Sequence, residues 1–307
     1  MASNPGVKAG RAAKKAAQAA KTDLSTRIAA GAKAVQGSKV VPDLSGDVKA
    51  LERKNIATLQ SPDAPAFDKD LACRQLALVG TKEAVPALAA LAVADDHLCD
   101  VACWGLERIP DPAADGALRE ALRKVKGRQQ QKIIQTIANR RDAKAADSLA
   151  ALMAGGDAEV AAVAARALGK IGGPAATRTL LTALEKAPAA VSPAAIGDGC
   201  VALADTLLAE GKANEAASVF RQVRMAKLPK HIRASGLRGE VLARKVDGVG
   251  PLIEELRSGD KERVNIAVRL IYEISDNALA ALRSKLGDEP KDVPRAALQA
   301  LKDRKQK

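Results

Sequence analysis

The sequence repeats itself about every thirty residues from Asp68 onward, and this period limits the folds open to the chain. Four successive stretches align, and each has the pattern of two helices joined by a short turn. A leucine in each expected second helix marks the register at steps of 30, 31 and 31 residues, at Leu88, Leu118, Leu149 and Leu180. One helical hairpin exposes an apolar face that only a neighbouring hairpin can cover. The period therefore predicts a stack of helical hairpins, an α-solenoid.

The fourth repeat, "DAEVAAVAARALGKIGGPAATRTLLTALEK" at residues 157–186, shows why each unit forms a hairpin. Its first helix carries an apolar stripe at helical spacing, made by Val160, Val163, Ala164, Ala167, Leu168 and Ile171. Asp157 is suited to accept hydrogen bonds from the free amides of the first turn. Gly172 and Gly173 permit the left-handed backbone that ends a helix, and Pro174 suits the first turn of the next one.

The rhythm changes after this repeat, because the next mark, Phe220, comes 40 residues after Leu180. The stretch between them has Gly211 between two expected helices that carry small residues at Ala204 and Ala216. It resembles a tetratricopeptide hairpin over roughly residues 200–225. Two further hairpins follow, with their marks at Ile253 and Leu282, and the chain ends in a half-unit.

The composition favours helices over sheets. Good helix formers, namely Ala, Leu, Lys, Arg and Glu, dominate the chain. One Trp, one Tyr and two Phe leave little aromatic volume for a large core, so thin layers filled by aliphatic side chains are expected. We therefore predict an all-α protein in which the following residues are buried between helices: Leu88, Leu118, Leu149, Leu168, Leu180 and Ile253.

Three stretches of the chain resemble a known kind of repeat. "DLACRQLALVGTKEAVPALAAL", "GLERIPDPAADGALREAL" and "NRRDAKAADSLAALM" are similar to the HEAT-like repeats, also called phycobilisome-lyase-type HEAT repeats, of bacterial multidomain proteins. The similarity is strong over residues 68–186 and looser over 187–290. It implies a right-handed α-solenoid that binds proteins and is often fused to catalytic or haem-carrying modules. No such module is visible in this sequence, so the resemblance implies a scaffold.

These patterns together predict an all-α fold, a right-handed α-solenoid of about seven stacked helical hairpins. The expected organisation is a basic Ala/Lys-rich segment, partly disordered or marginally helical, at 1–60, HEAT-like repeats at 61–186, divergent HEAT- and tetratricopeptide-like repeats at 187–290, and a basic capping helix and tail at 291–307. Roughly the first 40 residues are expected to be mobile, because their mostly Ala apolar content does not offset the entropy of ordering.

The net charge of +13 is concentrated at the two ends of the chain. Residues 1–60 hold eleven Lys/Arg against four Asp/Glu, residues 291–307 hold six against two, and the repeats between them are nearly balanced. Two basic stretches stand out inside the repeats, at 119–144 and 221–233. If second helices line the concave face, these stretches form one basic groove; the alternative is a solvated outer face. The candidate partner-binding residues are Arg119, Arg123, Arg140, Arg141, Arg221 and Arg224.

The expected function is that of a non-catalytic scaffold that binds another protein through its groove. The alternative is a nucleic-acid-binding solenoid that uses a basic concave surface and the basic tails. An enzyme is not expected: the adjacent carboxylates Asp95-Asp96 and Glu254-Glu255 point to different helix faces, and no phosphate-binding glycine loop is present. No catalytic or cofactor-binding residue is predicted. Trp104, the single Trp, is expected to pack in the core rather than to contact a ligand.

The four cysteines show no disulfide spacing, which favours a reducing compartment. Cys99 and Cys103 share a helix face near His97, but a zinc site needs a second pair of ligands. Small buried cysteines are therefore expected, and no metal site is predicted. No apolar stretch approaches the roughly 20 residues of a membrane helix. A cytoplasmic protein without membrane contact is expected, although a signal peptide removed before residue 1 would leave no trace.

Overall fold

The computed structural model describes residues 48–155, 157–189, 191–287 and 292–304, and within them the chain is all-α, as predicted. These residues form α-helices and three short 3-10 helices, with no strand among them. The expected first segment, 1–60, is described only from Val48 on, so the prediction that the first residues are mobile lies outside the described part.

Seven helical hairpins follow one another in the described part, as the repeat period predicted. They pair α3 (Ala66–Val79) with α4 (Val85–Ala94), α5 (Cys99–Arg108) with α6 (Ala113–Lys124), α7 (Gly127–Asn139) with α8 (Ala146–Met153), α9 (Ala158–Ile171) with α10 (Gly173–Lys186), α11 (Pro193–Ala209) with α12 (Ala213–Met225), α13 (Lys230–Arg244) with α14 (Val249–Leu256), and α15 (Lys261–Ile271) with α16 (Asp276–Leu286). Helix α2 (Val48–Gln60) precedes them, and α17 (Arg295–Asp303) follows. The 3-10 helices Lys82–Ala84, Ala143–Ala145 and Lys245–Gly248 lead into second helices.

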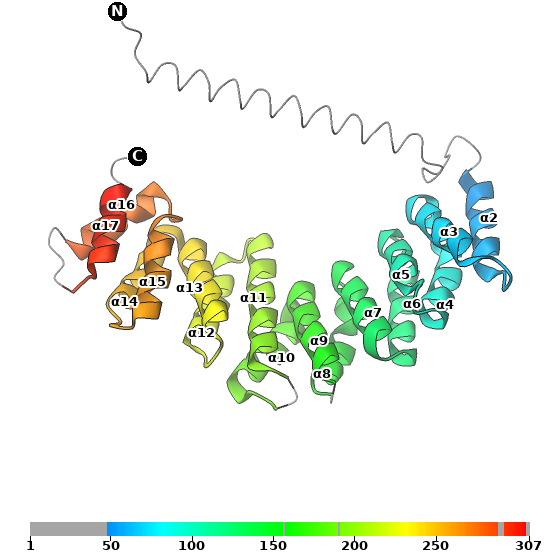
Figure 1. Cartoon of the computed structure of the whole chain (residues 1–307), viewed down its shortest axis with the longest axis horizontal. Helices are drawn as coiled ribbons and strands as arrows, with labels where there is room; N and C mark the ends of the chain where they lie inside the picture. Colours follow the sequence, from blue (N-terminus) through cyan, green and yellow to red (C-terminus); the bar gives the residue numbers. More distant parts are fainter. Residues whose placement is uncertain (1–47, 156, 190, 288–291, 305–307) are drawn as a thin grey trace, which may run out of the picture.

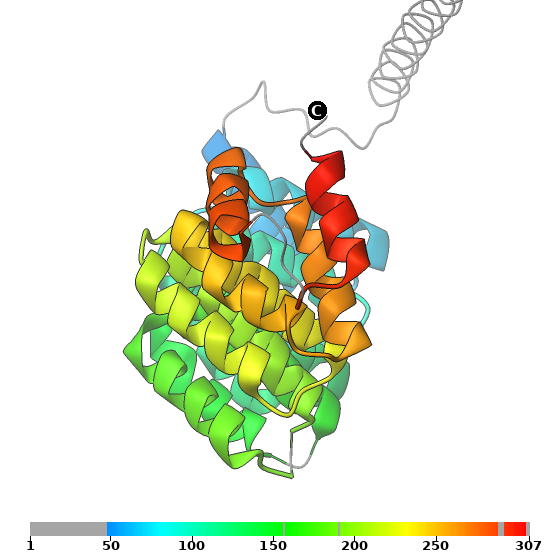
Figure 2. The same cartoon turned by 90° about the vertical axis from the view of Figure 1, so that its left-hand side faces the viewer.

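The hairpins stack side by side into an elongated, curved array (Figure 1). The first helices form one layer, in which α3, α5, α7, α9, α11, α13, α15 and α17 each pack on the next. The second helices lie in the other layer, where α2 packs on α4, α4 on α6, α8 on α10 and α14 on α16. Figure 2, which looks along the array, shows successive helices stacked behind one another. This arrangement is compatible with the expected α-solenoid.

The helix boundaries of the fourth repeat follow from its sequence. The Asp157 carboxylate accepts hydrogen bonds from the amides of Glu159 and Val160, both at 3.0 Å, and so caps α9. Gly172 ends that helix with a φ of 70°, a left-handed conformation that favours glycine. Pro174 lies in the first turn of α10, where its missing amide hydrogen costs nothing. Each of these roles was predicted from the residue types.

The core consists of aliphatic side chains between the two layers. All six residues predicted to be buried are buried: Leu88, Leu118, Leu149, Leu168, Leu180 and Ile253. The four cysteines are free and buried, which confirms their expected packing role. Trp104 differs from the prediction, because it is only half-buried and has the guanidinium of Arg108 5.6 Å from its ring centroid. The indole thus lies at the edge of the first layer rather than in its core.

The array begins earlier than the predicted boundary at residue 61. Helix α2 packs on α3 and α4 and buries Glu52 and Leu59. The Glu52 carboxylate accepts hydrogen bonds from the amide and the hydroxyl of Thr81, at 2.6 and 2.9 Å. Residues 48–60 are therefore a part of the helical array rather than a marginal helix. At the other end, α17 packs on α15.

Candidate functional site

Arg224, one of the six predicted partner-binding arginines, is buried, with only 5% of its side chain exposed. It extends from α12 and donates hydrogen bonds to three carboxylates. Its Nε lies 2.9 Å from Oε2 of Glu240, its Nη1 2.8 Å from Oε1 of Glu255, and its Nη2 3.2 Å from Oε2 of Glu254. The prediction that Arg224 lines a binding groove is therefore corrected: its guanidinium is fully used inside the protein.

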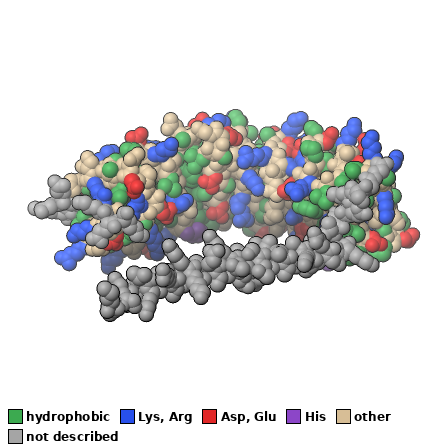
Figure 3. All heavy atoms as spheres, turned by 90° about the horizontal axis from the view of Figure 1, so that it is seen from above, with side chains coloured by type: hydrophobic (Ala, Val, Ile, Leu, Met, Phe, Trp, Pro, Cys, Tyr) green, Lys and Arg blue, Asp and Glu red, His purple; other side chains and the backbone are tan. Residues whose placement is uncertain are grey.

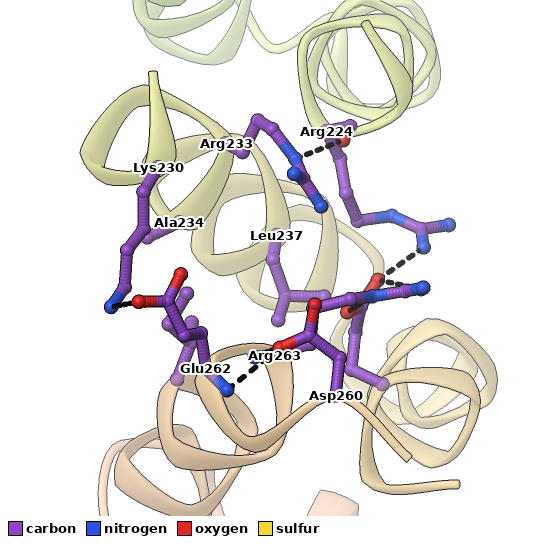
Figure 4. Close-up of a pocket in the computed structure, with 10 residues that line it drawn as sticks. Arg224, Lys230, Arg233, Ala234, Leu237, Asp260, Glu262 and Arg263 are labelled. Atoms are coloured by element: carbon purple, nitrogen blue, oxygen red, sulfur yellow. Dashed lines mark hydrogen bonds and ion pairs between the residues drawn. The ribbon is translucent and has the colours of Figure 1, made fainter. Parts of the chain in front are cut away.

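Glu255 is the centre of this buried network, because a second guanidinium also contacts it (Figure 4). Nε and Nη2 of Arg263 lie 2.6 and 3.0 Å from its carboxylate oxygens. Burial alone raises the pKa of Glu255, but the hydrogen bonds from Arg263 and Arg224 outweigh burial and lower the pKa below its ordinary value. A cavity of about 30 Å³ beside the network has room for about one water molecule. The network links four helices, α12, α13, α14 and α15.

Arg140 is also committed to the interior. Its guanidinium donates to backbone carbonyls at the end of α5, at 2.9 Å from Leu106 O and 3.2 Å from Glu107 O, and it pairs with Asp115. Arg304 has the same position after α17, where it donates to the carbonyls of Ile271, Tyr272 and Ile274 at the end of α15. Each arginine thus caps the first helix of the preceding repeat, so Arg140 joins repeats rather than a partner.

The other four predicted arginines lie at or near the surface but do not meet in one groove. Arg119 is partly buried and paired with Asp142, and the exposed Arg123 pairs with Glu120 on its own helix. Arg141 and Arg221 are exposed and form no ion pair with the described residues. On the face seen in Figure 3, Lys and Arg side chains are interspersed with acidic and apolar ones. The expected basic groove through Arg119, Arg123, Arg221 and Arg224 is not formed, since Arg224 is buried.

An open groove lies instead between α10 and α12, in the layer of second helices. Its volume is about 800 Å³. Helix α10 forms one wall, the end of α12 and the following loop form the other, and the start of α11 forms the floor. The side chains that define it are Arg178, Leu181, Leu184, Glu185, Pro193, Ile196, Gln222, Met225, Lys227 and Leu228.

The groove lies where the period of about thirty residues is interrupted. The step of 40 residues inserts a connection between α10 and α11, and α11 is 17 residues long. Helix α12 then packs mainly on α11 and α13, whereas α10 packs on α8, α9 and α11. The second layer is consequently open between α10 and α12. The sequence revealed this break in the period, but it did not identify the groove residues.

The groove is lined by both apolar and charged residues. Leu181, Leu184 and Leu228 are half-buried, and Met225 at the end of α12 is 67% exposed. Met225 and these leucines line the same groove, and the unbranched methionine side chain adapts readily to varied shapes. The cations Arg178 and Lys227 also line the groove; both are exposed, and neither forms an ion pair with a described residue.

Burial raises the pKa of the Cys73 and Cys200 thiols to about 12, so both are protonated and unreactive at neutral pH. In the part of the chain that the structure describes, no three His, Cys, Asp or Glu residues are grouped as metal ligands. No helix within that part is both long and apolar enough to cross a membrane.

A scan against protein-family models found no match for this chain, and a search of curated proteins found none either. The likeness to HEAT-like repeats therefore rests on the sequence motifs, whereas the structure establishes the stacked helical hairpins.

Proposed function

We propose that this chain is a non-catalytic scaffold that binds a partner protein in the groove between α10 and α12. The observation that carries the proposal is Met225, which is 67% exposed and lines an open groove together with Leu181 and Leu184. Fully burying such a side chain contributes about 1.5–3 kcal/mol, so a partner that covers Met225 and its leucine neighbours gains substantial free energy. The repeats are proposed to be HEAT-like and right-handed, and the four free cysteines favour a reducing, cytoplasmic location.

Helical walls suit this role because they hold the apolar side chains in fixed positions. Helices α10 and α12 each pack on α11, so the walls are supported from beneath. A preformed groove spares the partner part of the cost of ordering the surface to which it binds. The stacked array thus supplies a rigid site without a catalytic group.

The test compares two exposed apolar residues that lie in different places. Met225→Glu places a charge in the groove, while Phe67→Glu makes the same change at a 70% exposed position on α3. Both variants should retain the helical circular dichroism of the wild type. Proteins from the native source that bind the wild type are identified by mass spectrometry, produced separately and titrated. We expect Met225→Glu to weaken one such partner about tenfold or more, and Phe67→Glu to leave its affinity unchanged.

A partner affinity that both variants leave unchanged would rule out the groove as the binding site. A nucleic-acid titration tests the alternative function, which the exposed and unpaired Arg141 and Arg221 favour. We expect only weak binding at about 150 mM salt, near the physiological value, because interleaved aromatic side chains for base stacking are lacking among the described residues. Strong binding that Arg141→Glu and Arg221→Glu abolish would instead establish a nucleic-acid-binding protein.

A further inference from the structure

We infer that the occupant of the α10–α12 groove is an amphipathic helix of another protein, with an apolar stripe flanked by acidic residues. This inference rests on the proposed function and names the chemistry of the partner. It follows from the helices that line the groove, its apolar residues and the two unpaired cations among its lining residues.

The shape of the groove fits one helix. The groove is lined by α10 from Arg178 to its last turn, by the end of α12 with the loop that follows it, and by the start of α11 with Ile196. The nine helical residues 178–186 span about 14 Å, which matches about two and a half turns of a partner helix. A helix laid in such a groove inserts residues spaced three and four apart, which would contact Leu181, Leu184 and Met225.

The two unpaired cations that line the groove favour an acidic partner. Some exposed cations on the array surface have acidic partners, such as Lys212 with Glu210 at 2.9 Å and Arg238 with Glu273, whereas others, such as Arg141 and Arg221, have none among the described residues. Arg178 and Lys227 have no such partner in the described part of the chain, and Glu185 is the acidic residue that lines the groove with them. Carboxylates on either side of a docked apolar stripe would form charge-assisted hydrogen bonds with these two cations.

The same charges argue against two other occupants. Residues 1–47 of this chain hold eight Lys/Arg against three Asp/Glu, so this segment has the same sign as the two groove cations. A second copy carries the same net charge of +13, which opposes self-association. A separate protein with an acidic helix meets neither obstacle.

Three synthetic peptides test the inference directly. Each is a fluorescein-labelled helix of about four turns; the first has leucines at positions i, i+3, i+4, i+7 and i+11 with glutamates beside them. The second replaces the glutamates with lysines, and the third scrambles the first so that no stripe forms. Fluorescence anisotropy with the full chain should show that the glutamate peptide binds about tenfold or more tightly than either control. Equal binding of the scrambled peptide would assign the signal to the basic tails, and preferred binding of the lysine peptide would reverse the assigned charge; both overturn the inference.

Variants locate the peptide in the groove. Met225→Glu should weaken the glutamate peptide about tenfold or more. Arg178→Glu combined with Lys227→Glu should weaken the glutamate peptide and strengthen the lysine peptide. Arg166→Glu on α9 is the matched control, because Arg166 is exposed and unpaired among the described residues but lies outside the groove. Equal effects of all three changes would place the peptide elsewhere and overturn the inference.

The two proposals fail in different ways. A natural partner that requires Met225 but binds through an extended or basic segment overturns the acidic helix and leaves the scaffold function intact. If sedimentation shows a dimer and Met225→Glu dissociates it, a second copy of the chain occupies the groove. If residues 1–47 are protected from trypsin and the same variant removes this protection, this segment occupies the groove. Either result overturns the inference.

Discussion

The array contains two apolar cores. The contact that joins the two cores differs from the contacts that join neighbouring repeats within a core. The first core runs from Leu59 to Ile232 and the second from Leu237 to Leu301, so the seam between them falls inside α13. Within the first core, apolar side chains continue from one repeat to the next. At the seam, Arg224, Glu240, Glu255 and Arg263 bridge α12, α13, α14 and α15 with buried charges. Repeats with the same fold are thus coupled by two different kinds of contact.

The contact between α9 and α11 is an apolar contact in which the two helix backbones approach each other very closely. A Cβ added to Gly169 would lie 2.1 Å from the carbonyl oxygen of Gly199, so glycine alone permits this approach of the two backbones. Many small van der Waals contacts hold such an interface, and their loss is gradual when one side chain is trimmed. A buried ion network depends on every member, because a missing partner leaves a charge unpaired. The seam should therefore be the more fragile of the two joints.

Arg224→Met should produce the largest effect. It leaves the buried carboxylates of Glu240 and Glu255 without one of their guanidinium partners, which costs about 3–5 kcal/mol. Hydrogen exchange should rise in α13–α16 before it rises in α3–α9. Arg221→Met is the control on the same helix, because Arg221 is exposed and its replacement should change stability by about 0.5 kcal/mol or less. Equal loss of protection in both cores would contradict a separate seam.

Leu168→Ala probes the apolar joint. Leu168 is fully buried in α9, so its truncation should cost about 2–5 kcal/mol through lost burial and a cavity. Contacts run between neighbouring repeats, so protection should fall in α7–α11 first. Leu78→Ala, at a 51% exposed position on α3, is the matched control. Loss of protection that is uniform along the chain would argue against a stack of repeats.

Lowering the pH should destabilise the charged seam more than the apolar contacts within the first core. The folded-state pKa of Glu255 lies below its ordinary value of 4.5, so this carboxylate contributes stability above that pH and loses it as the pH falls through the folded-state pKa. Hydrogen exchange measured from neutral pH down to below 4.5 should show α13–α16 loosening before α5–α9. Glu255→Gln should weaken this pH dependence at the seam. An unchanged pH profile in that variant would assign the acid sensitivity to other carboxylates.

The apolar contacts between repeats could be predicted from the sequence better than the charged seam could, and the reason is physical. Leu88 and Leu168 repeat at positions set by helical geometry, so their burial follows from local pattern. Arg224 belongs to a basic stretch and was interpreted as a surface residue, because its partners Glu240 and Glu255 are 16 and 31 residues away. The prediction that adjacent Glu254 and Glu255 point to different faces was correct: their side chains are 65% and 5% exposed.

The groove could be predicted only in part. The 40-residue step to Phe220 indicated a change in the stack at this place. Whether that change fills a space or opens one depends on the direction of α12, which is fixed by its packing on α11 and α13. Met225 lies off the buried stripe that Phe220 and Val223 form on α12, so helical spacing accounts for its exposure, but the spacing does not show that it lines a groove. Packing between residues far apart in the sequence thus determines which residues line the groove.

The smallest predicted effect also tests whether the two cores respond separately, because the same capping contact occurs on both sides of the seam. Asp157 caps α9 in the first core, and Asp260 caps α15 in the second through the amides of Glu262 and Arg263, at 2.8 and 3.3 Å. Asp157→Ala should cost about 1 kcal/mol, within the usual range for a lost cap. Its loss of protection should stay in α9 and its neighbours, whereas Asp260→Ala should loosen α15 and leave α9 unchanged. Asp157→Asn and Asp260→Asn are the controls, since asparagine retains the capping oxygen. If either Ala variant loosens both cores equally, the charged seam transmits strain as well as an apolar joint does, and the distinction between the two joints fails.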